Sequence, residues 1–141
     1  MKTIVEFKDV TKAYGTGEHR LLAADHLSFT IGTGEFAVIL GPSGAGKSTL
    51  LNLLGGMDFA TGGEILVNGK NIVGLSDSQL TEYRAKHVGF VFQFYNLIPT
   101  LTALENVALT RSVVKDALNP AEVLESVGLG GHFQQFPSQL S

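Results

Sequence analysis

Eight consecutive residues, Gly41 to Ser48, match the pattern G-x-x-x-x-G-K-[ST] at every fixed position. Glycines at such spacing let successive backbone N–H groups turn inward around a phosphate with no Cβ in the way. Lys47 would add positive charge for the β- and γ-phosphates, Ser48 would offer a hydroxyl to Mg²⁺, and Thr49 would donate to the α-phosphate. The pattern therefore predicts a phosphate-binding loop for a nucleoside triphosphate. Its predicted contact residues are Gly41, Ser43, Gly44, Ala45, Gly46, Lys47, Ser48 and Thr49.

The residues on either side of this loop predict the elements that must position it. Residues 35–40 are apolar on both faces, which is typical of a strand buried in a parallel sheet. After the loop, leucines at helical spacing run to Gly55-Gly56, so a helix begins near Lys47 and aims its positive end at the phosphates. Strict alternation over Leu27–Ile31 predicts a further, half-buried strand.

Beyond residue 63 the chain contains further signals for strands and for helices. Residues 64–67 and 88–92 have the length and composition of strands, and Asn68-Gly69 predicts a hairpin turn after the first of them. From residue 94 onward the pattern is mostly helical. The predicted helix starts are Ser76 with Gln79, Thr102 with Glu105, and Asn119 with Pro120, and Gly128 is the predicted stop of the last helix.

Composition excludes several classes of protein. The 141 residues are 44% hydrophobic with a net charge of −3, which excludes a disordered chain and offers no basic surface for nucleic acid. Cysteine is absent, so disulfides and cysteine-bound metals are excluded, and the four histidines show no metal-ligand spacing. No apolar stretch approaches the roughly 18 residues that a membrane span requires. We expect a cytoplasmic chain that reaches a membrane only through a partner.

Three motifs resemble those of a known family. Residues 12–15, Lys-Ala-Tyr-Gly, look like its adenine-stacking loop, residues 41–49 like its Walker A motif, and residues 91–93, Val-Phe-Gln, like its Q-loop. The chain resembles the ATPase subunit of ABC transporters over essentially its whole length. Residues 94–102, followed by Glu-Asn-Val at 105–107, are similar to the branch that serves lipoprotein-releasing and macrolide-exporting systems.

The resemblance implies an α/β fold of the P-loop NTPase type. It implies a RecA-like nucleotide-binding core with an antiparallel β subdomain in residues 1–93, and part of a helical subdomain in residues 94–141. It also implies that Tyr14 stacks on adenine and that Gln93 contacts Mg²⁺ or the attacking water. The implied cofactors are ATP and Mg²⁺.

The resemblance further implies partners and a place in the cell. The apolar stretch Gln93 to Leu101 would receive a transmembrane permease subunit, and the intact subunit would form a homodimer around two ATP molecules. We therefore expect a peripheral protein at the inner face of the cell membrane, coupling ATP binding and hydrolysis to transport, with export implied by the branch.

The last residues resemble the start of a longer motif. Leu140-Ser141 would open the family's signature sequence, and no apolar strand ending in paired acids (Walker B) and no switch histidine is found. Because such an acid orients the attacking water and secures Mg²⁺, we expect the intact subunit to be an ATPase but this chain to bind ATP without hydrolysing it alone. The absent central strands would also leave apolar edges exposed, which predicts self-association.

Two other functions stay open on the sequence alone. A soluble phosphotransferase, such as a small-molecule kinase, uses the same loop, although the only arginines, Arg20, Arg84 and Arg111, are too widely spaced for a lid. A non-catalytic nucleotide-binding module is the other alternative.

Overall fold

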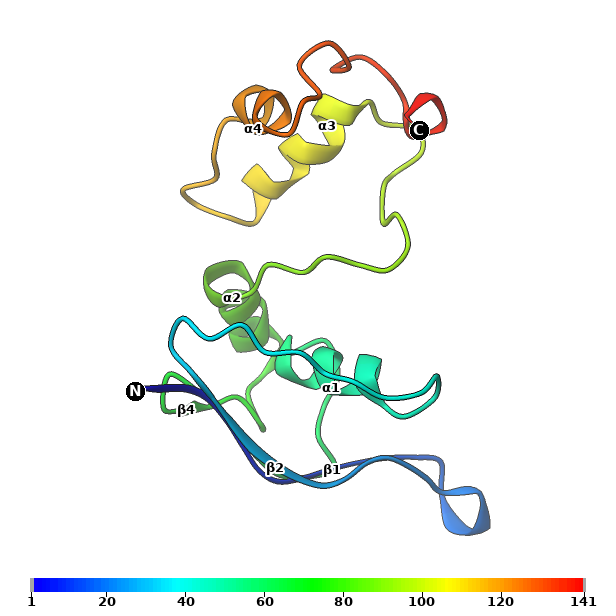
Figure 1. The fold of residues 1–141 in the computed structure, drawn as a ribbon, viewed down its shortest axis with the longest axis vertical. Helices are drawn as coiled ribbons and strands as arrows, with labels where there is room; N and C mark the ends of the chain where they lie inside the picture. The colour runs from blue at the N-terminus through cyan, green and yellow to red at the C-terminus, as the bar shows by residue number, and fades with distance from the viewer. Residues whose placement is uncertain (1, 141) are drawn as a thin grey trace. The chain divides into compact units, whose positions relative to one another are not determined.

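The computed structural model describes residues 2–140, and the chain divides into two compact units, Met1–Val88 and Gly89–Ser141 (Figure 1). Each unit is described by itself below. The functional boundary expected after Gln93 stays a prediction, and Ser141, part of the expected signature sequence, lies outside the described residues.

The first unit is built on a four-stranded sheet in the order β2-β1-β3-β4, and all its pairings are antiparallel. The long strands β1 and β2 form a hairpin through a short 3-10 turn, η1, and both carry β-bulges. The predicted strand over residues 27–31 is confirmed as part of β2, where the odd-numbered side chains are half-buried and the even-numbered ones exposed. The bounds are β1 Thr3–Tyr14, η1 Gly17–His19, β2 Leu21–Gly32, β3 Gly62–Val67 and β4 Lys70–Asn71.

Two helices, α1 (Lys47–Leu54) and α2 (Asp77–His87), contribute to the core that the sheet builds. The most deeply buried side chains are those of Phe7, Val10, Leu53 and Ile65. Phe7 also stacks on Phe29 across the β1–β2 pair, with ring centroids 4.5 Å apart. Such burial of large apolar side chains stabilises the unit by about 1.5–3 kcal/mol for each one.

The local turn and cap signals of this unit are confirmed. Asn68 and Gly69 both adopt positive φ, at 50° and 77°, as the tight turn between β3 and β4 requires. Ser76 caps α2 in a reciprocal capping box with Gln79. Gly55 follows the last residue of α1, as predicted.

The predicted buried strand at residues 35–40 is wrong for this structure. The segment forms no regular strand, and the side chains of Phe36 and Leu40 are 92% and 87% exposed. A strand is held by the N–H and C=O groups of its neighbours, and no strand within residues 2–140 pairs with this segment. It therefore runs from the sheet to the glycine-rich loop as irregular backbone.

The strand predicted at residues 88–92 is also wrong, for the same reason. These residues are irregular, they join no sheet in the part of the chain that the structure describes, and Val91 is 96% exposed. The parallel sheet expected from the run at residues 35–40 is therefore not formed by the described residues.

The second unit contains two short helices, α3 (Ala103–Ala108) and α4 (Pro120–Ser126), which contact each other. The 3-10 turns η2 (Leu109–Ser112) and η3 (Pro137–Gln139) complete it. All three helix signals are confirmed: Thr102 caps α3 in a capping box with Glu105, Asn119 caps α4, and Gly128 follows α4 with a φ of 82°. Between residues 2 and 140 there is no helix of the length and apolarity that crossing a membrane demands.

Candidate functional site

The glycine-rich loop turns sharply before α1, and two of its glycines make the turn possible. Gly44 and Gly46 have φ of 80° and 87°, a backbone region that residues with a Cβ avoid. Gly46 also lies against β2, where a Cβ would stand 2.2 Å from the carbonyl oxygen of Ala23. Position 46 therefore requires glycine for two reasons: its positive φ and the lack of space for a Cβ.

The N-terminus of α1 presents backbone donors without a side-chain partner. Gly46 is the N-cap, it offers no side-chain acceptor, and the first turn carries no acidic residue. The first N–H groups of a helix have no intrahelical acceptor, and the helix dipole places positive charge at the same end. This end of α1 is suited to a phosphate group.

Lys47 folds back over the loop. Its Nζ donates to the carbonyl oxygens of Gly41 and Pro42, at 2.7 and 2.6 Å, and the N–H of Ala45 donates to the same Pro42 carbonyl at 3.2 Å. The ammonium group is thus held beside the loop and close to the start of α1. A cation, a turn lined with glycine and the amides of a helix end therefore occupy one small region.

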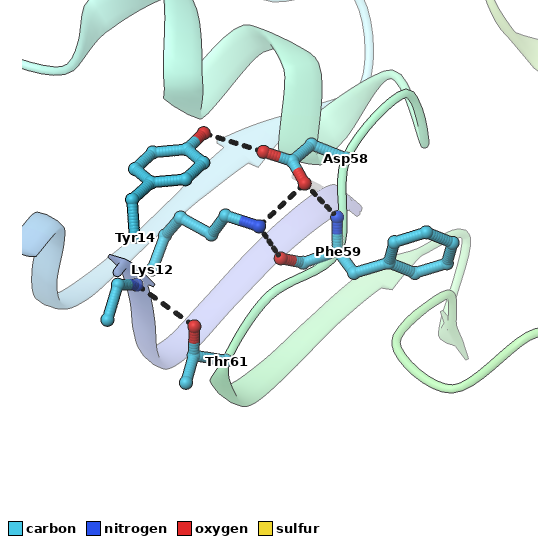
Figure 2. A network of polar contacts seen from close by, with 6 residues as sticks. Lys12, Tyr14, Asp58, Phe59 and Thr61 are labelled. Atoms are coloured by element: carbon cyan, nitrogen blue, oxygen red, sulfur yellow. Dashed lines mark hydrogen bonds and ion pairs between the residues drawn. The ribbon is translucent and has the colours of Figure 1, made fainter. Parts of the chain in front are cut away.

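Tyr14, at the end of β1, is fixed by its hydroxyl although its side chain is 42% exposed. Figure 2 shows the hydroxyl directed at the carboxylate of Asp58, to which it donates at 2.6 Å. The same carboxylate accepts from Lys12 Nζ, also at 2.6 Å, and from the backbone N–H of Phe59 at 2.7 Å. Lys12 Nζ also donates to the Phe59 carbonyl at 2.7 Å.

Electrostatics within this group follow from the contacts. The hydrogen bond to Asp58 is the main cause that raises the pKa of the Tyr14 phenol, whereas Thr49 in α1 acts in the opposite direction. Burial by itself would raise the pKa of Asp58, but hydrogen bonds from Lys12, Tyr14 and the Phe59 N–H together hold that pKa below its ordinary value. Tyr14 is therefore a neutral donor and Asp58 an anion at neutral pH.

The structure brings together the site residues predicted in the first unit. The loop residues 41–49 run directly into α1, and Thr49 lies close enough to Tyr14 to affect its hydroxyl. Gln93 belongs to the second unit, where it is exposed and irregular, and its expected contact with Mg²⁺ stays a prediction. Among residues 2–140 no group of three or more histidines and acids is placed to hold a metal ion.

The sequence did not predict the contacts among Lys12, Asp58 and Thr61 that fasten the end of β1. One signal was present: Lys12 follows Val10 at the inward-facing positions of the strand, where a charged side chain needs a partner. The partner itself, 46 residues away, carried no recognisable pattern.

The fold is that of a known family. The model of the ABC transporter family matches residues 24–141, and the chain belongs to that family. The chain is 44% identical over 146 residues to an ABC transporter ATP-binding protein of Thermotoga maritima, a match that covers all of this chain and 62% of the relative. It is 41% identical to the lipoprotein-releasing system ATP-binding protein LolD of Alcanivorax borkumensis, with 98% of this chain and 63% of the relative covered.

Comparison with a solved structure shows the same fold. The dimeric structure of a post-hydrolysis state of the ATP-binding cassette MJ0796, bound to ADP and Pi, matches with a TM-score of 0.88 and 39% identity. That match covers 98% of this chain and 63% of the cassette chain. The expected fold class, a P-loop NTPase with an antiparallel β subdomain, is confirmed. The chain spans a little over three-fifths of the length of these relatives.

Proposed function

We propose that this chain is the nucleotide-binding part of an ABC transporter ATPase and that it binds ATP through the loop at residues 41–49 and Tyr14. The observation that carries the proposal is the position of Lys47 Nζ over the loop carbonyls, next to the uncapped start of α1. Relatives named as ATP-binding proteins support ATP as the nucleotide. Family membership favours this function over a soluble phosphotransferase.

Each of these residues would bind a different part of the nucleotide. The ammonium of Lys47 exchanges its loop carbonyls for the β- and γ-phosphates, and the first amides of α1 bind phosphate oxygens. Thr49 donates to the α-phosphate, and the exposed ring of Tyr14 stacks on adenine, an interaction worth about 1–3 kcal/mol. The start of α1 fits an anion because its N-cap glycine offers no side-chain acceptor and no acidic side chain lies in its first turn.

Magnesium and hydrolysis belong to the same proposal. Ser48 would bind Mg²⁺ with its hydroxyl, and Gln93 would contact the same ion or the attacking water. The bound ion would neutralise charge that develops on the transferred phosphoryl group. We propose that the longer subunit hydrolyses ATP, whereas the 141-residue chain, which lacks the paired acids of a Walker B strand, binds it without turnover.

Partners are proposed from the relatives and from exposed apolar side chains. The dimeric cassette structure supports a dimer of the whole subunit. A macrolide export ATP-binding/permease protein of Aggregatibacter actinomycetemcomitans is 42% identical over 98% of this chain, a match that covers 22% of that protein. Its name supports coupling to a permease and hence export at the inner face of the membrane. Within residues 93–101, Phe94 and Tyr95 are 76% and 95% exposed, as a permease-docking surface requires.

Lys47→Ala tests the proposed function. We expect the substitution to weaken Mg·ATP binding about 10- to 100-fold, because a charge-assisted hydrogen bond to phosphate contributes about 1.5–3 kcal/mol. Calorimetric titration of the purified chain with Mg·ATP measures the change. Lys115→Ala, which removes an exposed lysine of the second unit, is the matched control and should bind as the unchanged chain does.

Equal affinity of the two variants would contradict the proposal. Phosphate release should also be absent from the 141-residue chain at saturating Mg·ATP. Turnover that disappears with Lys47→Ala would show that the chain contains a complete hydrolytic site, and the part of the proposal that separates binding from turnover would then be wrong.

A further inference from the structure

Three consecutive residues at the end of β1 are each fastened to the loop before β3. The side chain of Lys12 binds Asp58 and Phe59, the backbone N–H of Ala13 donates to the Thr61 hydroxyl at 2.9 Å, and the phenol of Tyr14 donates to Asp58. Figure 2 shows the contacts of Lys12, Tyr14 and Phe59 meeting at Asp58, with the Thr61 contact drawn beside them. The two segments are more than 40 residues apart in the sequence, so the network is a tertiary feature.

The network includes a buried lysine, and burying a lysine costs free energy unless its charge has partners. Lys12 is 9% exposed, and lysine is almost never buried without a partner. Its ammonium has two acceptors, and it also lies over the Tyr14 ring, 4.8 Å from the ring centroid. Lys12 therefore supports Asp58 and one face of the Tyr14 ring together.

The hydroxyl of Tyr14 does not need this arrangement for its own solvation, because the side chain is 42% exposed and water is available. The bond to Asp58 fixes the orientation of the ring. Because Asp58 holds the hydroxyl and Lys12 covers one face, the other face of the ring is held at a fixed angle to the rest of the unit. A ring held in this way loses little freedom when a planar ligand stacks on it.

We propose that Asp58, supported by Lys12, is a positioning residue for the nucleotide base: it holds the Tyr14 ring in the orientation that stacks on adenine and contributes nothing to phosphate binding. The inference rests on the proposed function, because it takes Tyr14 as the base-stacking residue. Asp58 acts on the ligand only through Tyr14. Its effect should therefore depend on the presence of a base and on the tyrosine hydroxyl.

The experiment compares two ligands, ATP and inorganic tripolyphosphate, which carries the phosphates without a base. Asp58→Ala should weaken binding of Mg·ATP about three- to tenfold, as a part of the stacking energy, and leave the affinity for tripolyphosphate unchanged within about twofold. Asp116→Ala, which removes an exposed acid of the second unit, is the matched control and should change neither affinity.

A second variant keeps the test independent of folding. Tyr14→Phe retains the ring and removes only the hydroxyl, so it should reproduce the loss of ATP affinity, and Asp58→Ala should cause no further loss in that background. Parallel loss of ATP and tripolyphosphate in Asp58→Ala would show a structural role and overturn the inference. So would additive losses, or Tyr14→Phe that binds ATP like the unchanged chain.

Failure of the underlying function gives a different result. If the unchanged chain bound neither ATP nor tripolyphosphate, the phosphate-binding function itself would be wrong and the inference would fall with it. If it bound both and Asp58→Ala had no selective effect, only the positioning role would be wrong.

Discussion

Lys12 and Asp58 form an ion pair that is largely withdrawn from water, with side-chain exposures of 11% and 25%. Removing one member of such a pair leaves the other charge without its partner in a poorly solvated place. Replacing such a pair with apolar residues of similar volume is often neutral or stabilising in proteins. The contact of the same carboxylate with Tyr14 gives the pair a function besides stability.

Lys12→Met removes the charge and keeps most of the apolar stem. We expect a loss of about 1–3 kcal/mol in the free energy of unfolding at neutral pH, because Asp58 then lacks its strongest donor. Since the folded-state pKa of Asp58 is lowered, the stability it contributes is present above its ordinary pKa of 3.8 and is lost as the pH falls through the lower folded value. The difference between variant and unchanged chain should therefore shrink in that acid range.

Urea denaturation at a series of pH values measures this difference. Lys8→Met is the matched control, because Lys8 lies on the same strand but its side chain is 48% exposed. Its Nζ is 3.5 Å from the Glu6 carboxylate, a longer distance than the 2.6 Å between Lys12 and Asp58. Surface pairs contribute little, so its effect should be small at every pH. A Lys12→Met effect independent of pH would show that packing, and not the charge pair, is what the lysine supplies.

The contrast between Lys47 and Asp58 shows what sequence can predict about a site. The phosphate-binding loop was predictable because its chemistry lies within nine consecutive residues whose spacing is fixed by the ligand. Asp58 was not, because its role depends on a β1–β3 pairing that brings residue 12 beside residue 58. Local chemistry is recorded in the sequence directly, whereas tertiary partners appear only once the strands are paired.

At the scale of elements, the start of α1 depends on two glycines with different surroundings. Gly44 and Gly46 share a positive φ, but a Cβ at Gly44 would meet nothing within 4 Å, whereas at Gly46 it would meet the Ala23 carbonyl oxygen at 2.2 Å. A substitution at Gly44 therefore tests only the backbone conformation of the loop, whereas one at Gly46 also tests its packing against β2.

Gly44→Ala and Gly46→Ala test this separation. Gly44→Ala should lower the free energy of unfolding by about 1–2 kcal/mol, because a residue with a Cβ is strained in the left-handed region. Gly46→Ala should cost clearly more, because the loop or β2 must also move. Urea denaturation followed by circular dichroism gives both values. Equal losses would mean that the contact with β2 relaxes freely and that only the backbone conformation matters.

The helix caps and the hairpin turn were predicted correctly because nearby residues complete them, and the strands predicted at 27–31 and 64–67 form because β1 pairs with both. The capping boxes of α2 and α3 and the Asn68-Gly69 hairpin are closed by residues within four positions of one another. The apolar runs at 35–40 and 88–92 gave an equally clear strand signal, yet neither is a strand. A strand needs a neighbour, and apolar character alone cannot supply one.

At the scale of the whole molecule, these unpaired runs leave apolar side chains on the surface. In the first unit Phe36, Val38 and Leu40 are 92%, 64% and 87% exposed within five residues. Single exposed apolar residues are common in soluble proteins, but a contiguous run is not. The backbone of this run is also without a sheet partner among the described residues, so it can pair with another chain.

We therefore expect the purified chain to self-associate, with an average mass by light scattering that rises with concentration. Phe36→Ser combined with Leu40→Ser should lower the mass at a given concentration and leave the unfolding free energy nearly unchanged, because both side chains make few contacts in the folded chain. Leu118→Ser, which removes an exposed apolar side chain outside the run, is the control and should associate as the unchanged chain does. A constant monomer mass up to the highest soluble concentration would contradict the expectation, because an open apolar run free of any partner would then be tolerated in water.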